Sequence, residues 1–418
     1  MVTARAQSSG ESSPGSGDQT PKWTVMIFMG ADNVPGDASL KKEAEDTIRM
    51  LNEDIQPSDS INIFVQLHAD GRIERQHVWR GKRTAVNLAL EDSTNGKALT
   101  RFLDWAMETS EHRPGDYSML VMWGHTFEFG VGPQVLRNGI DALDFAELSD
   151  VMGRFQQEHA RKYPNVYGPD EVPKLNIIGF DACDVATVEM ACQLEPFADY
   201  LLASQIGVPL PGWPYGEVLG RLRDPKGDVM GPAELGSYIA RRYCAHYAAQ
   251  DRRVTLSMLD LKRAPTLFDL AERLARRLAL VLDDGDEFDV VYDLFFHSRT
   301  PDDRPFIDVA DFCLNLMRDS GYQSVRQAAE ALGDFLITPN PGDFESEAIR
   351  PSAVGVGRPF IVENSRNSAD TAGLNGVSLY APHVADHDFE KASYFYDKFA
   401  FAQKTLWGQL VQGLAMSQ

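Results

Sequence analysis

Cysteine is scarce in this chain. Four residues among 418 are cysteines, and they are widely separated: Cys183, Cys192, Cys244 and Cys313. This number is too low for a disulfide scaffold, and the close cysteine pairs that mark zinc sites do not occur. We therefore expect reduced thiols, as in a cytosol, and no metal site.

Positively charged residues are fewer than negatively charged ones, and long apolar runs are lacking. The 40 Lys and Arg residues face 61 Asp and Glu residues, a net charge of −21, so nucleic acids and anionic membrane surfaces would be repelled. No stretch approaches the roughly 20 apolar residues of a membrane span, and the N-terminus has no apolar signal-peptide core. These absences predict a cytoplasmic protein that binds neither nucleic acid nor membrane.

Apolar residues, by contrast, make up 43% of the chain, and the length exceeds one typical domain of about 100–200 residues. The Ser- and Gly-rich residues 1–21 are predicted to be a disordered tail. Over residues 22–263, short apolar runs alternate with helical patterns, which predicts a mainly parallel α/β sheet with helices on both faces. Residues 264–418 are predicted to form a helical region with a few strands, packed on that domain.

The expected elements follow from this alternation. Expected strands are 22–30, 61–69, 117–124, 175–180, 199–205, 358–364 and 375–382, with a hairpin addition at 75–81. Expected helices are 38–52, 96–108, 144–163, 184–193, 264–283, 305–318 and 323–336. The acidic run at 282–289 does not match a calcium-binding loop and is expected to be a solvated turn.

Two of the expected strands end in reactive side chains. "SMLVMWGH" ends in His125, and "NIIGFDAC" ends in Cys183, 58 positions later (183 − 125). Catalytic groups of open parallel sheets gather beyond the carboxyl ends of the strands, and this spacing allows a crossover to a neighbouring strand. We therefore expect an imidazole and a thiol across one cleft, the pair that acyl transfer by a thiolate requires.

Cys183 has two interpretations at this stage. If the next helix begins at Asp184, its positive dipole end favours the thiolate. A single cysteine after a strand is, however, also a common small core residue.

The same residues resemble the clostripain family of cysteine peptidases, which belongs to the caspase and gingipain clan. The resemblance rests chiefly on 177–219, "IIGFDACDVATVEMACQLEPFADYLLASQ" with the following "PLPGWPYGEVL", and on "WTVMIFMGADN" and "LVMWGH". Weaker matches, "VTLSMLDL", "FIDVADF", "GVSLYAP" and "FAQKTLW", continue in the family's order to residue 407. The resemblance implies a caspase-like fold and cleavage of proteins after Arg, less readily Lys.

The family resemblance implies catalytic and binding roles for individual residues of this chain. The resemblance implies His125 as catalytic base and Cys183 as nucleophile, with the Cys183 N–H as an oxyanion donor. Asp181 corresponds to the acidic residue that would bind the basic substrate side chain, although an N-cap contact with the next helix is its alternative. The substrate-facing loop begins at Ser204 and Gln205.

In that loop Trp213 and Tyr215 are expected either to pack on the stem of a bound Arg or to close over the core. One departure concerns the oxyanion hole. The family usually has Gly after the catalytic histidine, whereas Thr126 stands here; its N–H remains a possible second donor.

Relatives are commonly zymogens cut between the two catalytic residues. We favour the bond after Arg137, in a Gly-flanked stretch, over Arg161, Lys162 and Lys174. Self-cleavage or an upstream protease would then activate the enzyme. No cofactor is expected to be required, and calcium is possible only through the resemblance.

Two further functions stay open. One is a catalytically silent caspase-like scaffold that binds a partner protein, which Thr126 favours; the other, more distant, is a thiol hydrolase of small amides.

Overall fold

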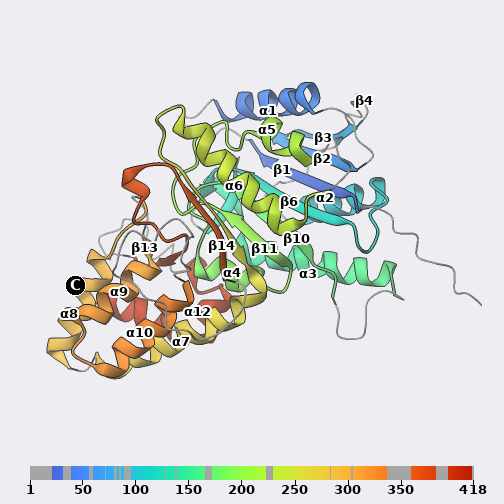
Figure 1. The fold of residues 1–418 in the computed structure, drawn as a ribbon. Helices are drawn as coiled ribbons and strands as arrows, with labels where there is room; N and C mark the ends of the chain where they lie inside the picture. The colour runs from blue at the N-terminus through green and yellow to red at the C-terminus, as the bar shows by residue number, and fades with distance from the viewer. Residues whose placement is uncertain are drawn as a thin grey trace, which may run out of the picture.

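The computed structural model describes residues 21–31, 39–55, 60–70, 72–79, 82–83, 86–88, 96–127, 129–136, 139–164, 172–222, 229–282, 284–302, 305–336, 359–382 and 394–416. Within these ranges a ten-stranded sheet runs through the molecule in the order β14-β12-β11-β10-β6-β1-β2-β3-β4, with β5 beside β3 (Figure 1). Its strands are β1 Trp23–Gly30, β2 Ile61–Ala69, β3 Arg72–Trp79, β4 Lys82–Arg83, β5 Val86–Leu88, β6 Tyr117–Gly124, β10 Leu175–Asp181, β11 Ala198–Ala203, β12 Thr255–Asp260 and β14 Ile361–Arg366.

The five central strands β2, β1, β6, β10 and β11 are parallel. Antiparallel strands complete the edges, with β3 beside β2, and β12 and β14 beyond β11. All eight residues of β1 are buried, as expected for a strand covered on both faces, which reads as a continuous apolar run rather than an alternating one. The predicted mainly parallel sheet is confirmed.

Helices cover both faces of the sheet (Figure 1). One face packs on α1 (Leu40–Asp54), α5 (Tyr215–Leu219) and α6 (Pro232–Ala248), and the other on α2 (Gly96–Thr109), α3 (Phe145–Lys162) and α4 (Val188–Leu194). Alternate side chains of β1 enter the two cores: Val25 and Ile27 face the first, and Met26 and Phe28 the second. This alternation is the two-residue period of a strand.

The C-terminal part gathers several helices beside the sheet (Figure 1). They are α7 Ala264–Val281, α8 Gly285–His297, α9 Val309–Asp319, α10 Gln323–Leu336, α12 Ala400–Lys404 and α13 Trp407–Met416. Two short strands, β13 (Phe306–Asp308) and β15 (Ser378–Tyr380), pair with each other. From the same part of the chain, β14 joins the main sheet beside β12.

The acidic run at 282–289 is not a solvated turn. Its second half begins α8, and Asp284 caps that helix by accepting the Asp286 N–H at 3.1 Å. Carboxylates at a helix start accept hydrogen bonds from free N–H groups and interact favourably with the positive end of the helix dipole. The acidic residues that suggested a turn therefore stabilise the start of a helix. Among the helices described, none is both long and apolar enough to cross a bilayer.

Candidate active site

The two reactive side chains follow neighbouring parallel strands. β6 and β10 pair in register, with Trp123 opposite Asp181. His125 and Cys183 each lie two residues beyond this aligned pair, and adjacent strands are only about 4.8 Å apart. The carboxyl ends of parallel strands share one edge, so both positions that the sequence singled out lie at the same edge of the sheet.

A tight backbone contact fixes the histidine end. Gly124 has φ +139°, and a Cβ there would lie 2.6 Å from the Gly30 carbonyl oxygen. The chain then turns into a small sheet of β7 (Thr126–Phe127), β8 (Gly130–Leu136) and β9 (Gly139–Asp144). The His125 carbonyl accepts the Gly132 N–H at 2.9 Å. Both sides of His125 are thus held by main-chain contacts.

The expected helix start at Asp184 is wrong. α4 begins at Val188, and Thr187 is its N-cap, accepting the Met190 N–H at 3.1 Å. Cys183 therefore lies in a turn before the helix and not in its first turn, so the helix dipole does not act directly on the thiol. Asp184 has φ +59°, a left-handed conformation that is uncommon outside glycine and concentrates at functional sites.

The sulfur of Cys183 has a different donor. The Val208 N–H donates to Sγ at 3.2 Å, and a donor at that position stabilises negative charge on the sulfur. Beside the thiol is a cavity of only about 10 Å³, which is room for about one water molecule. Its lining includes Thr126, Phe129, Phe145, Phe306 and Phe399.

Asp181 is a buried carboxylate with an unused oxygen. It is 3% exposed, and its Oδ2 accepts the Trp213 N–H at 2.9 Å and the Tyr215 hydroxyl at 2.8 Å. Within the described residues Oδ1 has no hydrogen-bond partner. Burial raises the pKa of Asp181 to about 7, and the two hydrogen bonds oppose that rise only in part. Its contacts are with the 204–216 loop, and the N-cap of α4 is Thr187 instead.

That loop wraps closely around the carboxylate. A Cβ on Gly212 would lie 2.3 Å from Oδ2 of Asp181, and the residue has φ +90°, so only glycine fits here. Tyr247 of α6 donates to the Gly212 carbonyl at 2.8 Å. Trp213 and Tyr215 are each 1% exposed, and the Trp213 ring lies against Gly179 of β10. In this state both rings close over the core, and neither presents a face for a bound Arg to pack on.

Ser204 and Gln205 lie inward as well. Ser204 is fully buried and shares a hydrogen bond with Thr255 at 3.0 Å. The Gln205 side chain donates to Asp308 and Ser378 and accepts the Gly376 N–H. Both residues begin the expected substrate loop, yet their side chains bind neighbouring segments of the protein itself.

The four candidate processing positions lie in different parts of the structure. Arg137 lies outside the described residues; β8 ends just before it, and Leu136 pairs with Gly139. Arg161 and Lys162 are in the last turn of α3. Lys174 donates to the Glu195 carbonyl oxygen at 2.6 Å and pairs with the Glu195 carboxylate at 3.2 Å.

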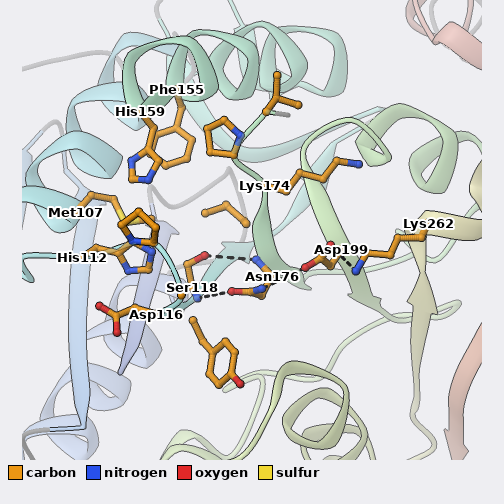
Figure 2. A pocket seen from close by; sticks show the side chains of 16 residues that line it. Met107, His112, Asp116, Ser118, Phe155, His159, Lys174, Asn176, Asp199 and Lys262 are labelled. Carbon is orange, nitrogen blue, oxygen red and sulfur yellow. Dashed lines mark hydrogen bonds and ion pairs between the residues drawn. The ribbon is translucent and has the colours of Figure 1, made fainter. Parts of the chain in front are cut away.

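A larger hollow lies at the opposite end of the central strands (Figure 2). It measures about 560 Å³, and Ser118, Asn176, Asp199 and Lys262 follow one another along one wall. These groups bind each other: Asn176 donates to Asp199 at 3.1 Å, and Lys262 pairs with Asp199 at 3.0 Å. Because the hollow adjoins the amino ends of β6 and β10, it lies away from His125 and Cys183.

No three His, Cys, Asp or Glu side chains within the described ranges are grouped so as to hold a metal ion.

Some contacts of this site were not predicted from the sequence. Val208, Gly212 and Tyr247 contact the reactive groups or their loop, and only Gly212, in "PGWP", carries a turn signal in the sequence.

The sheet order, with parallel central strands and helices on both faces, is a caspase-like fold. The model of the clostripain family matches residues 27–323, and the chain belongs to that family.

Solved structures agree on the fold. An inactive zymogen C11 protease from Parabacteroides distasonis is 15% identical, with a TM-score of 0.60 over 93% of this chain and 99% of that one. A secreted C11 cysteine protease from Bacteroides thetaiotaomicron, bound to an irreversible peptide inhibitor, is 16% identical, with a TM-score of 0.57 over 90% and 99%. A search of curated protein sequences found no match.

Proposed function

We propose that this protein is a cysteine endopeptidase that cleaves protein substrates after Arg, and less readily after Lys. Cys183 is the nucleophile, and His125 removes its proton and later protonates the leaving amine. Asp181 binds the basic side chain of the substrate. The N–H groups of Cys183 and Thr126 are the proposed oxyanion donors.

The observation that carries this proposal is the paired register of β6 and β10. His125 and Cys183 each follow an aligned residue pair of these strands by two residues, at the sheet edge where catalytic groups gather, and Asp181 stands two residues before the cysteine. The Oδ1 of Asp181, which has no partner among the described residues, adds support for the specificity. A buried acceptor without a partner is costly, and a guanidinium of the substrate would satisfy it.

The crowding around the site supports a latent state. The cavity beside Cys183 admits about one water molecule, and Gly212, Trp213 and Tyr215 enclose Asp181. Activation by cleavage after Arg137 would cut the chain between β9 and β8, the strand that binds the His125 carbonyl through the Gly132 N–H. The alternatives at Arg161 and Lys162 are helical, and proteases bind extended chain, so those bonds are poorer substrates.

Short peptides that carry a reporter group after Arg test the activity directly. We expect hydrolysis by the wild-type protein and none by Cys183→Ala. Cys192→Ala is the matched control, because burial raises the pKa of the Cys192 thiol and disfavours its thiolate. Equal turnover of Asp-terminated reporters would reject the proposed specificity.

Activation is tested by sequencing the N-termini that form when the purified protein is incubated. The proposal expects a new chain that begins at Asn138, with a rise in activity, and a Cys183→Ala protein that stays whole. If Cys183→Ala is cut at the same rate, another protease makes the cut. An intact, fully active chain would reject the zymogen model.

The second candidate is a silent scaffold that keeps the fold to bind a partner protein. Thr126, whose buried hydroxyl has no partner among the described residues, favours it by narrowing the space beside the thiol. A thiol-reactive inhibitor that mimics Arg separates the two, since only a working site reacts selectively at Cys183.

Location and calcium dependence stay predictions. The cytoplasmic location rests on the sequence, whereas one structural neighbour is described as secreted. Calcium support rests on the family resemblance alone. Reporter hydrolysis measured with calcium and with a chelator would decide it.

A further inference from the structure

The C-terminal part of the chain contacts the turn that carries the proposed nucleophile. Ser378 of β15 donates its N–H to the Ala186 carbonyl at 2.8 Å, and it forms an isolated parallel bridge with Thr187. On the other side, the end of β11 holds the same segment, because the Ala186 N–H donates to the Ser204 carbonyl at 2.9 Å. The residues just after Cys183 therefore lie between two parts of the chain that are far apart in sequence.

A buried carboxylate organises this contact. Asp308 is fully buried and accepts four hydrogen bonds. They come from the Gln205 amide (3.1 Å), the Asp311 N–H (3.0 Å), the Asn375 N–H (2.7 Å) and the Asn375 amide (2.9 Å). Each carboxylate oxygen accepts two of them, so the neutral donors of four groups converge on one side chain.

Gln205 connects Asp308 to Gly376 and Ser378, next to the segment that follows Cys183. Its amide nitrogen donates to Asp308 and, at 3.0 Å, to the hydroxyl of Ser378, and its carbonyl oxygen accepts the Gly376 N–H at 2.6 Å. The side-chain amide is thus engaged at both its nitrogen and its oxygen. We call Gln205, Asp308, Asn375 and Ser378 the Asp308 network.

A second tie joins β15 to α4. Glu189, in the first turn of α4, is 1% exposed and accepts the Tyr380 N–H at 3.0 Å and the Tyr396 hydroxyl at 3.2 Å. The strand β15 is therefore bound at Ser378 to the segment before α4 and at Tyr380 to the helix itself. Two contacts on one short strand fix its orientation as well as its distance.

We infer that Asp308 is a positioning residue for catalysis: the Asp308 network holds the C-terminal part against residues 184–187 and so sets the place of Cys183. This inference rests on the proposed function, in which Cys183 is the nucleophile. The turn needs such support because Asp184 holds a left-handed conformation, which persists only where surrounding contacts enforce it.

Asp308→Asn is the direct test, because it keeps the volume but turns one oxygen, which accepts two hydrogen bonds, into a donor. We expect kcat per active site, titrated with an irreversible inhibitor, to fall on the order of a hundredfold, since small displacements of reacting groups cost about that much. KM should stay within about twofold because Asp308 does not touch the substrate.

Asp311→Asn is the matched control, three residues later at the start of α9. Among the described residues the hydrogen bonds that its carboxylate accepts come from Arg299 and Asn315, within the C-terminal part, and its kcat should not change. If Asp308→Asn does not fold, Ser378→Ala decides instead. That change removes one acceptor of Gln205, keeps the main-chain bond to Ala186, and should lower kcat about fivefold.

Amide hydrogen exchange separates this inference from the proposed function. We expect faster exchange at residues 184–190 in Asp308→Asn than in Asp311→Asn, whether or not the protein cleaves peptides. A wild-type protein without activity or labelling at Cys183 would reject the peptidase. Unchanged exchange at 184–190, or fewer titratable sites with a normal kcat per site, would reject the positioning role.

Discussion

Replacing Asp181 by Asn should make the protein more stable and a worse peptidase. In the folded chain burial raises the pKa of Asp181 from 3.8 to about 7. A folded-state pKa above the unfolded value means that the native protein holds its proton more tightly, so the stability this adds is lost as the pH rises from about 4 to 7. Over about three pH units, at about 1.4 kcal/mol each, the loss is at most about 4 kcal/mol.

Asp181→Asn removes this loss of stability with rising pH and retains the hydrogen bonds of Asp181. Its oxygen can take the place of Oδ2 and accept both the Trp213 N–H and the Tyr215 hydroxyl, while its nitrogen takes the place of Oδ1, which has no partner among the described residues. Urea unfolding at pH 5 and pH 8 measures the effect. Asp181→Asn should gain several kcal/mol at pH 8 and little at pH 5.

Cleavage after Arg should weaken in Asp181→Asn, whereas stability increases. A guanidinium pairs with the ionised carboxylate, which makes up about a tenth of Asp181 at pH 6 and about nine-tenths at pH 8 for a pKa of about 7. The ratio of kcat/KM for Arg reporters to that for citrulline reporters, which share the shape without the charge, should therefore rise about tenfold between these pH values. In Asp181→Asn the ratio should be flat, and Arg cleavage about a hundredfold or more slower.

A loss of stability in Asp181→Asn at pH 8 would contradict the expected gain, because the carboxylate would then be a favourable structural contact. A preference for Arg over citrulline that persists in Asp181→Asn would show that another group binds the substrate charge.

Three more predictions concern the supports of the site. Gly124→Ala should cost at least about 2 kcal/mol in urea unfolding, since its Cβ would meet the Gly30 carbonyl; Gly220→Ala, where the added Cβ meets nothing within 4 Å, is the control, and equal losses would contradict us. Thr187→Ala should cost about 1 kcal/mol through the lost cap of α4, and Thr187→Ser should restore it. Asp144→Ala loses both the cap of α3 and the pair with Lys398 (2.9 Å), about 1–2 kcal/mol in all, whereas Asp144→Ser should lose only the pair; equal losses from both would show that the cap contributes nothing.

The sequence predicted the central sheet well because both of its faces are buried. "WTVMIFMG" and "YSMLVMWG" are continuous apolar runs, and each forms a parallel strand at the expected place. Local patterns misplaced the start of α4, where Ala186 and Thr187 are bound by Ser204 and Ser378, neither of which is a neighbour in sequence. They also misjudged 282–289, since an acidic run favours a turn and a helix start alike.

The sequence by itself determined the five central parallel strands, the family, and the pair of strand ends that carry His125 and Cys183, because hydrophobic period and motif spacing are local properties. Only the tertiary structure decided what surrounds those side chains. That Asp181 is enclosed by Gly212 and Tyr215, and that Gln205 binds Asp308 and Gly376, depends on residues between about 30 and 170 positions apart in the chain. Hydrogen bonds over such separations depend on how distant segments pack, and local hydrophobic patterns do not record them.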